Sequence, residues 1–178
     1  MIREMNAGEL LELVRELDRE IDEPIVIRAV GGFALAWRGV RTEGLTADID
    51  SITDDYSPRV CNAIAVVGSR HGLDQWWLNN DAAADDADFL IESLDLKWEL
   101  VDAGFKNITL YIADLGSLLK LKLSAVEDSA LSGRTRDLDD TIRLLVMLGF
   151  DKPMFKKRYS HLREDMPHAF ELITRAIW

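Results

Sequence analysis

Two aspartates separated by one isoleucine, Asp48-Ile49-Asp50, are the residues of this sequence whose spacing most directly suggests chemistry. In a β-strand, residues i and i+2 project from the same face, so the two carboxylates would stand side by side. Neighbouring carboxylates repel each other unless a cation lies between them. Hard divalent cations such as Mg²⁺ bind carboxylate oxygens, and substrate phosphates complete their coordination. The pair therefore predicts a divalent-metal site; the alternative is a solvated acidic pair at an exposed strand edge.

A glycine step, Gly31-Gly32, precedes the acidic pair, with the 15 residues 33–47 between them. It follows an apolar run at 25–30 that predicts a buried strand, and it precedes a short helix predicted over 33–38. Glycines leave room for a ligand to approach the backbone, and N–H groups at the start of a helix can bind a phosphate. The order of strand, glycine step, helix, loop and strand thus predicts both halves of a site for a metal and a triphosphate.

The surrounding pattern predicts an α+β fold. We expect a mixed β-sheet with helices packed on one face in residues 1–113, followed by a helical C-terminal region, residues 114–178, packed on this core. Residues 74–88 show no clear pattern. Hydrophobic spacing and capping residues predict helices over 7–21, 57–70, 115–126, 136–148 and from 153 onward, and strands over 25–30, 47–53, 96–101 and 105–112.

The composition restricts the classes of function. The formal net charge of −11 argues against a strong autonomous binder of DNA or other nucleic acid, because neutralising phosphates requires clustered Lys and Arg. A single cysteine, Cys61, excludes an intramolecular disulfide and a cysteine-based zinc cluster. No run approaches 18 apolar residues and the N-terminus lacks an apolar signal core, so we expect a cytoplasmic protein without a membrane partner.

The residues of the glycine step and the acidic pair also carry a family resemblance. Gly31-Gly32, a short helix, Arg41, Thr46 and Asp48-Ile49-Asp50 resemble the signature of the nucleotidyltransferase fold, the superfamily of DNA polymerase β and kanamycin nucleotidyltransferase. The pattern is similar to the minimal branch that includes the AbiEii-like toxins. "LLKLKLSA" and "RTRDLDD" are similar to the helices "LLxxKLxA" and "RxKDLxDL" of that branch. The resemblance covers about residues 25–148.

The resemblance implies roles for these residues. Asp48 and Asp50 would bind Mg²⁺ or Mn²⁺, and Gly31 and Gly32 would face a nucleoside triphosphate. Arg41 would hold a phosphate or be an ordinary loop charge, and the same signature includes Thr46. The spacing between the glycines and the acids is slightly longer than is usual, with an insertion expected at 42–45.

A third carboxylate on a later strand would complete the metal site or act as a base. We choose Glu99, which lies in the middle of a predicted strand, and keep Asp95 and Asp102 as alternatives. A solvent-facing strand residue is the other interpretation of Glu99. Without a third carboxylate, the protein would bind a nucleotide and not turn it over.

Two residues of the C-terminal half match the branch's helices. Lys122 matches the lysine of "KLxA" and would contact a phosphate of the nucleotide. Asp137 matches the aspartate of "RxKD" and would orient that lysine. The alternative for Lys122 is a lysine on the solvent-exposed face of an amphipathic helix. The alternative for Asp137 is a carboxylate near a helix N-terminus, where the helix dipole favours negative charge. Asp140, one turn later, is expected as a surface charge.

The expected function is therefore Mg²⁺-dependent transfer of a nucleoside monophosphate to a hydroxyl of an RNA, a protein or a small molecule. A toxin with a cognate antitoxin is one setting that the resemblance implies. The alternative is a catalytically inactive binding or regulatory module with the same fold. For an RNA acceptor, the only basic cluster is Lys152, Lys156, Lys157, Arg158 and Arg163.

Overall fold

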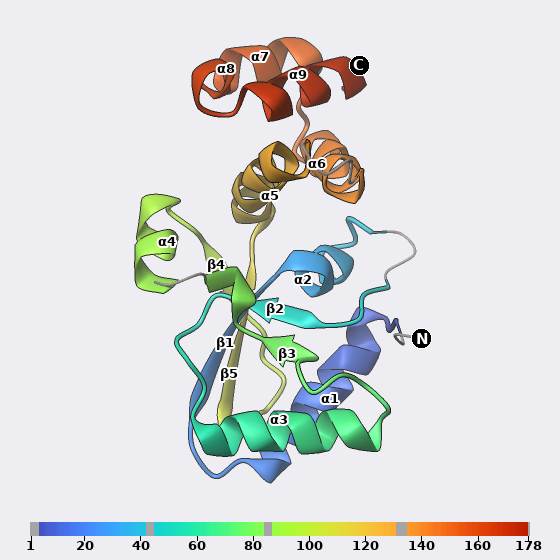
Figure 1. Ribbon diagram of the computed structural model, residues 1–178, viewed down its shortest axis with the longest axis vertical. Coiled ribbons are helices and arrows are strands. Elements are labelled where there is room, and N and C mark those ends of the chain that lie inside the picture. Colours follow the sequence, from blue (N-terminus) through green and yellow to red (C-terminus); the bar gives the residue numbers. More distant parts are fainter. Residues whose placement is uncertain (1–3, 42–44, 84–86, 131–134, 178) are drawn as a thin grey trace. The chain divides into compact units, whose positions relative to one another are not determined.

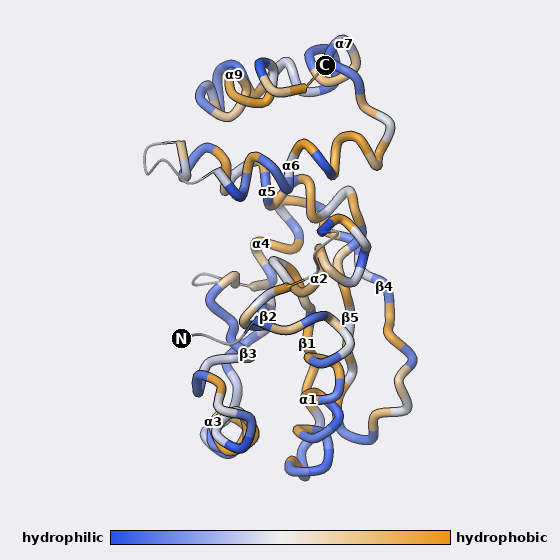
Figure 2. The backbone as a smooth tube through the Cα atoms, turned by 90° about the vertical axis from the view of Figure 1, so that its right-hand side faces the viewer, coloured by the Kyte–Doolittle hydropathy of each residue, from blue (hydrophilic) through white to orange (hydrophobic). Residues whose placement is uncertain are grey.

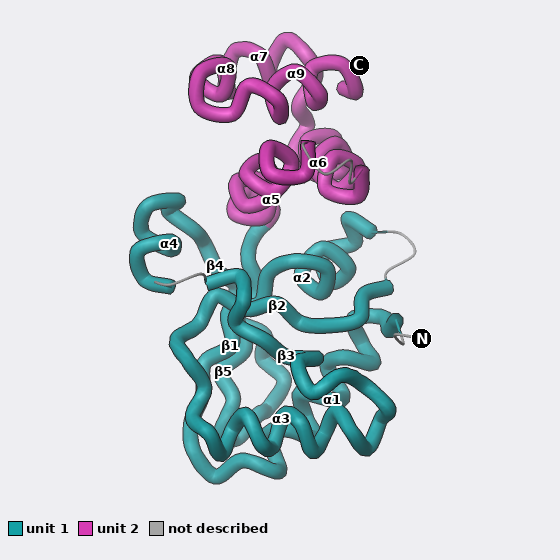
Figure 3. Tube along the Cα trace, viewed as in Figure 1, with its two compact units in different colours: residues 1–114 teal, residues 115–178 magenta. Residues whose placement is uncertain are grey.

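The computed structural model describes residues 4–41, 45–83, 87–130 and 135–177. The chain divides into two compact units, residues 1–114 and 115–178 (Figure 3). The boundary predicted from the sequence lies one residue earlier, between 113 and 114. Among the described helices, none has the length and apolar character needed to span a membrane.

Unit 1 is built on a five-stranded mixed sheet, so the expected α+β class is confirmed (Figure 1). The strand order is β3-β2-β1-β5-β4. Strand β1 lies parallel to β5 and antiparallel to β2, β3 is parallel to β2, and β4 is antiparallel to β5. The strands are β1 (Ile25–Val30), β2 (Ile49–Ser51), β3 (Leu78–Asn79), β4 (Trp98–Leu100) and β5 (Ile108–Ala113).

One face of the central strands is buried and the other is partly exposed. On β1, Ile27 and Ala29 are fully buried, and they alternate with the half-buried Arg28. This alternation is the period of two that a strand with one covered face requires. Strand β2 continues it, because Ile49 and Ser51 are fully buried while Asp50 between them is half-buried.

Two amphipathic helices supply the apolar side chains of this core. Helix α1 (Ala7–Glu20) begins at a capping box, in which Asn6 Oδ1 accepts from the Glu9 backbone N–H and the Glu9 carboxylate accepts from that of Asn6. Helix α3 (Pro58–Arg70) has Ser57 as its N-cap. Figure 2 shows hydrophobic and hydrophilic residues alternating around both helices. Their buried apolar side chains are Leu10, Leu13, Val14 and Leu17 in α1, and Val60, Ala63, Ile64 and Val67 in α3.

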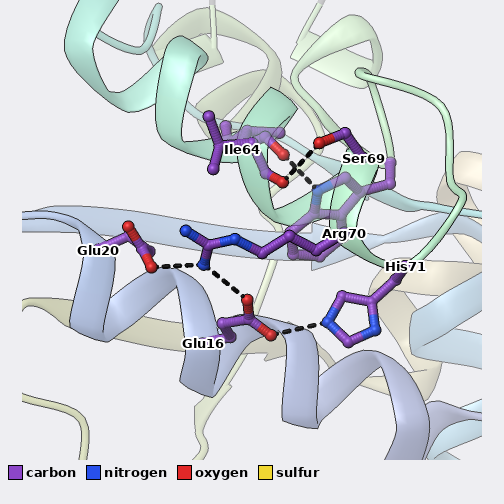
Figure 4. A network of polar contacts seen from close by, with 8 residues as sticks. Glu16, Glu20, Ile64, Ser69, Arg70 and His71 are labelled. Atoms are coloured by element: carbon purple, nitrogen blue, oxygen red, sulfur yellow. Dashed lines mark hydrogen bonds and ion pairs between the residues drawn. The ribbon is translucent and has the colours of Figure 1, made fainter.

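A charged network joins α1 to the end of α3 (Figure 4). Arg70 Nη1 lies 2.9 Å from the Glu16 carboxylate and 2.5 Å from that of Glu20, and His71 Nε2 lies 2.7 Å from Glu16 Oε2. The hydrogen bond from His71, and then that from Arg70, lowers the pKa of the Glu16 carboxyl below its ordinary value. The network thus stabilises the ionised form of Glu16.

The elements differ from the predicted ranges in two instructive places. The strand predicted over 47–53 is reduced to β2: β1 ends at Val30, opposite Asp50, so residues before Asp50 have no partner on β1, and Ile49 pairs with Leu78 of β3 instead. Beyond Ser51, the Ile52 N–H still donates to the Arg28 carbonyl of β1. The stretch without a clear pattern holds β3, a 3₁₀ turn (Asp81–Ala83) and α4 (Ala87–Ser93). A two-residue strand is too short to leave a periodic signal.

Unit 2 is entirely helical in its described residues. It contains α5 (Leu115–Ala130), α6 (Arg136–Met147), α7 (Lys152–Arg158), α8 (Leu162–Asp165) and α9 (Pro167–Ala176). The single helical region expected after residue 153 is broken into three pieces. One break is at Pro167, which starts α9, because proline favours the first turn of a helix and interrupts a helix interior.

Candidate functional site

The pairing of β1 with β2 brings the glycine step to the acidic pair. Val30 lies opposite Asp50 in the antiparallel ladder, and the next residue, Gly31, starts α2 (Gly31–Trp37) with a φ of +61°. A Cβ atom at Gly31 would lie 2.0 Å from Asp50 Oδ2 and 3.0 Å from its Cγ. A side chain at this position is therefore incompatible with the observed position of the Asp50 carboxylate.

Gly32, the second glycine, leaves space for the side chains of two further predicted site residues, Thr46 and Arg41. A Cβ atom at Gly32 would lie 2.4 Å from Thr46 Oγ1 and 2.7 Å from Arg41 Nη1. Both side chains therefore reach the backbone at Gly32 through the space that glycine leaves. The structure brings the four predicted nucleotide-facing residues, Gly31, Gly32, Arg41 and Thr46, to one place, although residues 42–44 of the expected insertion lie outside the described residues.

Each carboxylate of the pair accepts a hydrogen bond from a neutral donor. Thr46 Oγ1 lies 3.3 Å from Asp48 Oδ1, and Asn79 Nδ2 lies 3.4 Å from Asp50 Oδ1. Asp48 precedes β2, so the same-face rule for strands does not fix its direction. The contacts of Thr46 nevertheless connect Asp48 to Gly32, while Asp50 lies against Gly31. Both carboxylates are half-buried and belong to one cluster with the two glycines.

Asn79 is the residue of this cluster that the sequence analysis missed. It pairs with Asp50 in the parallel ladder between β2 and β3, and its side-chain oxygen accepts from the Asp81 backbone N–H. This second bond fixes the orientation of the amide, so the NH₂ group faces Asp50. No local motif marks Asn79, because its position depends on a strand pairing 29 residues along the chain.

Glu99 is not brought to the acidic pair. It lies on β4, where it pairs with Ile112 of β5, and the sheet order puts β5 and β1 between β4 and β2. Three strand spacings separate the strands of Glu99 and Asp50 by about 14 Å. The Glu99 carboxylate instead accepts from Arg38 Nη1 at 2.6 Å, with 64% of its side chain exposed. Asp95 and Asp102 flank the same edge strand, and Asp95 forms an ion pair with Lys97.

Lys122 and Asp137 meet inside unit 2. Lys122 Nζ on α5 lies 2.6 Å from Asp137 Oδ1 and 3.3 Å from Asp140 Oδ2, both on α6. Ser129 Oγ donates a further hydrogen bond to Asp137. The side chains of Lys122, Asp137 and Asp140 are 13%, 10% and 4% exposed, so the expectation that Asp140 is a surface charge is wrong. This largely buried ion-pair cluster joins α5 to α6 within unit 2.

The two carboxylates of the cluster in unit 1, those of Asp48 and Asp50, suit a hard cation whose remaining ligands come from a substrate. Within the described ranges, no group of three or more His, Cys, Asp or Glu side chains is arranged to hold a metal ion by itself. Mg²⁺ commonly binds to one or two carboxylates together with substrate phosphates, and Asp48 and Asp50 supply that number. The Arg41 guanidinium beside Gly32 offers a donor for phosphate oxygens.

Comparison of the chain with protein-family models, curated proteins and solved structures finds no match in any of the three. The interpretation of the site therefore depends on its own geometry and on the resemblance of its short motifs.

Proposed function

We propose that this protein is a Mg²⁺- or Mn²⁺-dependent nucleotidyltransferase of the nucleotidyltransferase fold. The observation that carries the proposal is the close approach of Asp50, Thr46 and Arg41 to two consecutive glycines, where a Cβ atom would overlap them. Solvated acids at a strand edge would not require such space. A metal–triphosphate ligand needs carboxylates for the metal and a cationic donor for the phosphates in one place, and the two glycines allow Asp50, Thr46 and Arg41 to gather there.

In the proposed reaction, an acceptor hydroxyl oxygen forms a bond to the α-phosphorus of the triphosphate, the bond to the β-phosphate breaks, and pyrophosphate and a proton leave. Asp48 and Asp50 would hold the divalent metal, which when bound would supply charge neutralisation for the phosphates and activation of the acceptor oxygen. Thr46 and Asn79 orient the two carboxylates through the hydrogen bonds described above. Arg41 would bind the triphosphate at the glycine step.

A binding test separates this proposal from a solvated acidic pair. We would measure the melting temperature with each nucleoside triphosphate, with and without Mg²⁺. A ligand that binds only the folded state raises it by mass action, and a hundredfold excess over the dissociation constant stabilises by about 2.7 kcal/mol. We expect a Mg²⁺-dependent rise for one triphosphate, lost in Asp50→Asn and retained in Asp54→Asn, an exposed control on the same segment. No rise with any triphosphate would contradict the proposal.

The position of Glu99 favours a second candidate, a nucleotide-binding regulatory module without turnover. Transfer of label from an α-³²P-labelled triphosphate to an acceptor distinguishes the two. Mg²⁺-dependent binding without any transfer to cellular RNA or protein would support the module. Transfer that depends on Asp48 and Asp50 would support the enzyme, and the labelled acceptor would show whether a toxin role and a cognate antitoxin are worth pursuing.

A further inference from the structure

The charges of the chain are unevenly divided between its two units. Residues 1–114 contain 10 Lys and Arg against 23 Asp and Glu, a formal net charge of −13. Residues 115–178 contain 11 basic and nine acidic residues, a net charge of +2. Within unit 2, residues 152–163 hold five basic residues and no acidic one. The acidity that argues against nucleic-acid binding therefore belongs to unit 1.

Helix α7 displays most of these cations on a fixed support. Its N-cap Asp151 accepts from the Met154 backbone N–H, and Phe155 is fully buried, with its ring 5.7 Å from that of Phe170 on α9. Lys156, Lys157 and Arg158 are exposed. One buried aromatic residue thus anchors the helix, and its charged residues remain in water.

A fifth cation joins the same surface from α8. The Arg163 guanidinium lies 5.0 Å from the centre of the Phe170 ring, which is the ring that Phe155 stacks on. We call Lys152, Lys156, Lys157, Arg158 and Arg163 the α7–α8 basic surface. None of these five residues forms an ion pair within the part of the chain that the structure describes, whereas Arg38, Arg70 and Lys122 all do.

We infer that the α7–α8 basic surface binds the phosphate backbone of RNA and that RNA is the acceptor class of the transfer, an inference that rests on the proposed function. Clustered cations without carboxylate partners match a polyanion, and RNA also carries the hydroxyls that the proposed reaction requires. An anionic membrane is a poorer match, because membrane-surface helices insert apolar side chains and Phe155 is buried in the unit. Met154, 50% exposed, is the remaining large apolar side chain of α7.

The number of cations sets the expected salt dependence. For single strands, the logarithm of affinity falls with the logarithm of salt concentration with a slope of about −0.7 per neutralised phosphate, so five contacts give about −3.5. Affinity should then fall about a hundredfold between 50 and 200 mM salt. Removing three cations should reduce the slope to about −1.4 and the fall to about sevenfold.

The test is fluorescence anisotropy with a labelled single-stranded oligouridine and the full chain. The variant Lys156→Gln, Lys157→Gln, Arg158→Gln removes three charges of the surface. The control Arg19→Gln, Arg59→Gln, Lys106→Gln removes three from exposed positions of unit 1. We expect the surface variant alone to weaken binding and flatten the salt slope. Equal loss in both variants, or no binding by the unaltered protein at 50 mM salt, would overturn the inference, as would binding to phosphatidylserine vesicles but not to RNA.

The same experiment keeps the two proposals apart. Asp50→Asn should bind oligouridine as the unaltered protein does, because Asp50 is not on the basic surface. The surface variant should keep its Mg²⁺-dependent thermal response to the triphosphate. A failed triphosphate response with intact RNA binding would count against the proposed function, and a normal triphosphate response with absent RNA binding would count against the acceptor inference.

Discussion

Replacing Gly31 by alanine tests whether the glycine step is built around the Asp50 carboxylate. Gly31 has a φ of +61°, so an alanine there must adopt a left-handed conformation that costs about 1–2 kcal/mol. Its Cβ would also meet Asp50 Oδ2 at 2.0 Å and Asp50 Cβ at 3.2 Å. Displacing a packed side chain adds about 1–3 kcal/mol. We expect Gly31→Ala to lower the free energy of unfolding by about 2–5 kcal/mol in total.

Gly39 provides a matched control. Its φ is +71°, and nothing lies within 4 Å of the position that a Cβ would take. Gly39→Ala should therefore cost only the backbone term of about 1–2 kcal/mol. Urea unfolding of both variants gives the two free energies, and their difference isolates the clash with Asp50.

A double-mutant cycle completes the test. Asp50→Ala removes the two carboxylate atoms nearest to the built Cβ and leaves Asp50 Cβ at 3.2 Å. In that background, Gly31→Ala should cost about as much as Gly39→Ala, which gives a coupling energy of about 1–3 kcal/mol. Gly31→Ala should also abolish the Mg²⁺-dependent thermal response, which Gly39→Ala should keep. Equal costs at the two glycines, or no coupling to Asp50, would refute the reasoning.

Three further changes test contacts away from the glycine step. The Asp18 carboxylate accepts hydrogen bonds from three consecutive backbone N–H groups, at 106–108. Asp18→Ala should therefore lower the free energy of unfolding in urea by about 3 kcal/mol. Asp22→Ala, at an exposed position, should change it by almost nothing. Lys122→Met leaves the buried Asp137 carboxylate without its cation and should cost about 3–5 kcal/mol; a change below 1 kcal/mol would show that the ion pair is not formed. Because folding lowers the pKa of Glu16, the stability that Glu16 contributes is full above its ordinary pKa of 4.5 and is lost as the pH falls through the lower folded value. Unfolding midpoints measured from pH 6 to about pH 3 should therefore fall more steeply for the unaltered protein than for Glu16→Gln, and parallel curves would contradict this account.

Local sequence patterns predicted the helices and strands whose formation depends on neighbouring residues along the chain. The capping box at Asn6 and the helical spacing of apolar residues gave the start of α1, and the β-branched run at 25–30 gave β1 with its observed bounds. The glycine step and the acidic pair were also found from their own residues. They could be recognised because backbone freedom and carboxylate chemistry are properties of residue type.

Features that depend on strand order could not be predicted in the same way. Glu99 was chosen because it lies on a strand, but its distance from Asp50 is fixed by β5, which pairs with β1 and leaves β4 at the edge. Asn79 was missed because its contact with Asp50 comes from the parallel pairing of β3 with β2. Both errors have the same physical origin: the face of a residue follows from alternation along its own strand, whereas its neighbours follow from the sheet as a whole.

Gly32 gives the strongest reason to interpret the cluster as a binding site. Unlike Gly31, it has no positive φ, so its backbone conformation would accept alanine. Glycine in a helix is less favourable than alanine, by up to about 1 kcal/mol, and the atoms nearest to a Cβ built at Gly32 belong to Thr46 (Oγ1 at 2.4 Å, Cβ at 3.0 Å) and Arg41 (Nη1 at 2.7 Å). Departures from local preference concentrate at functional sites, where stability is given up for geometry. Here the departure brings a hydroxyl and a cation to the backbone beside two carboxylates, an arrangement that a solvated strand edge does not need and a metal–triphosphate ligand does.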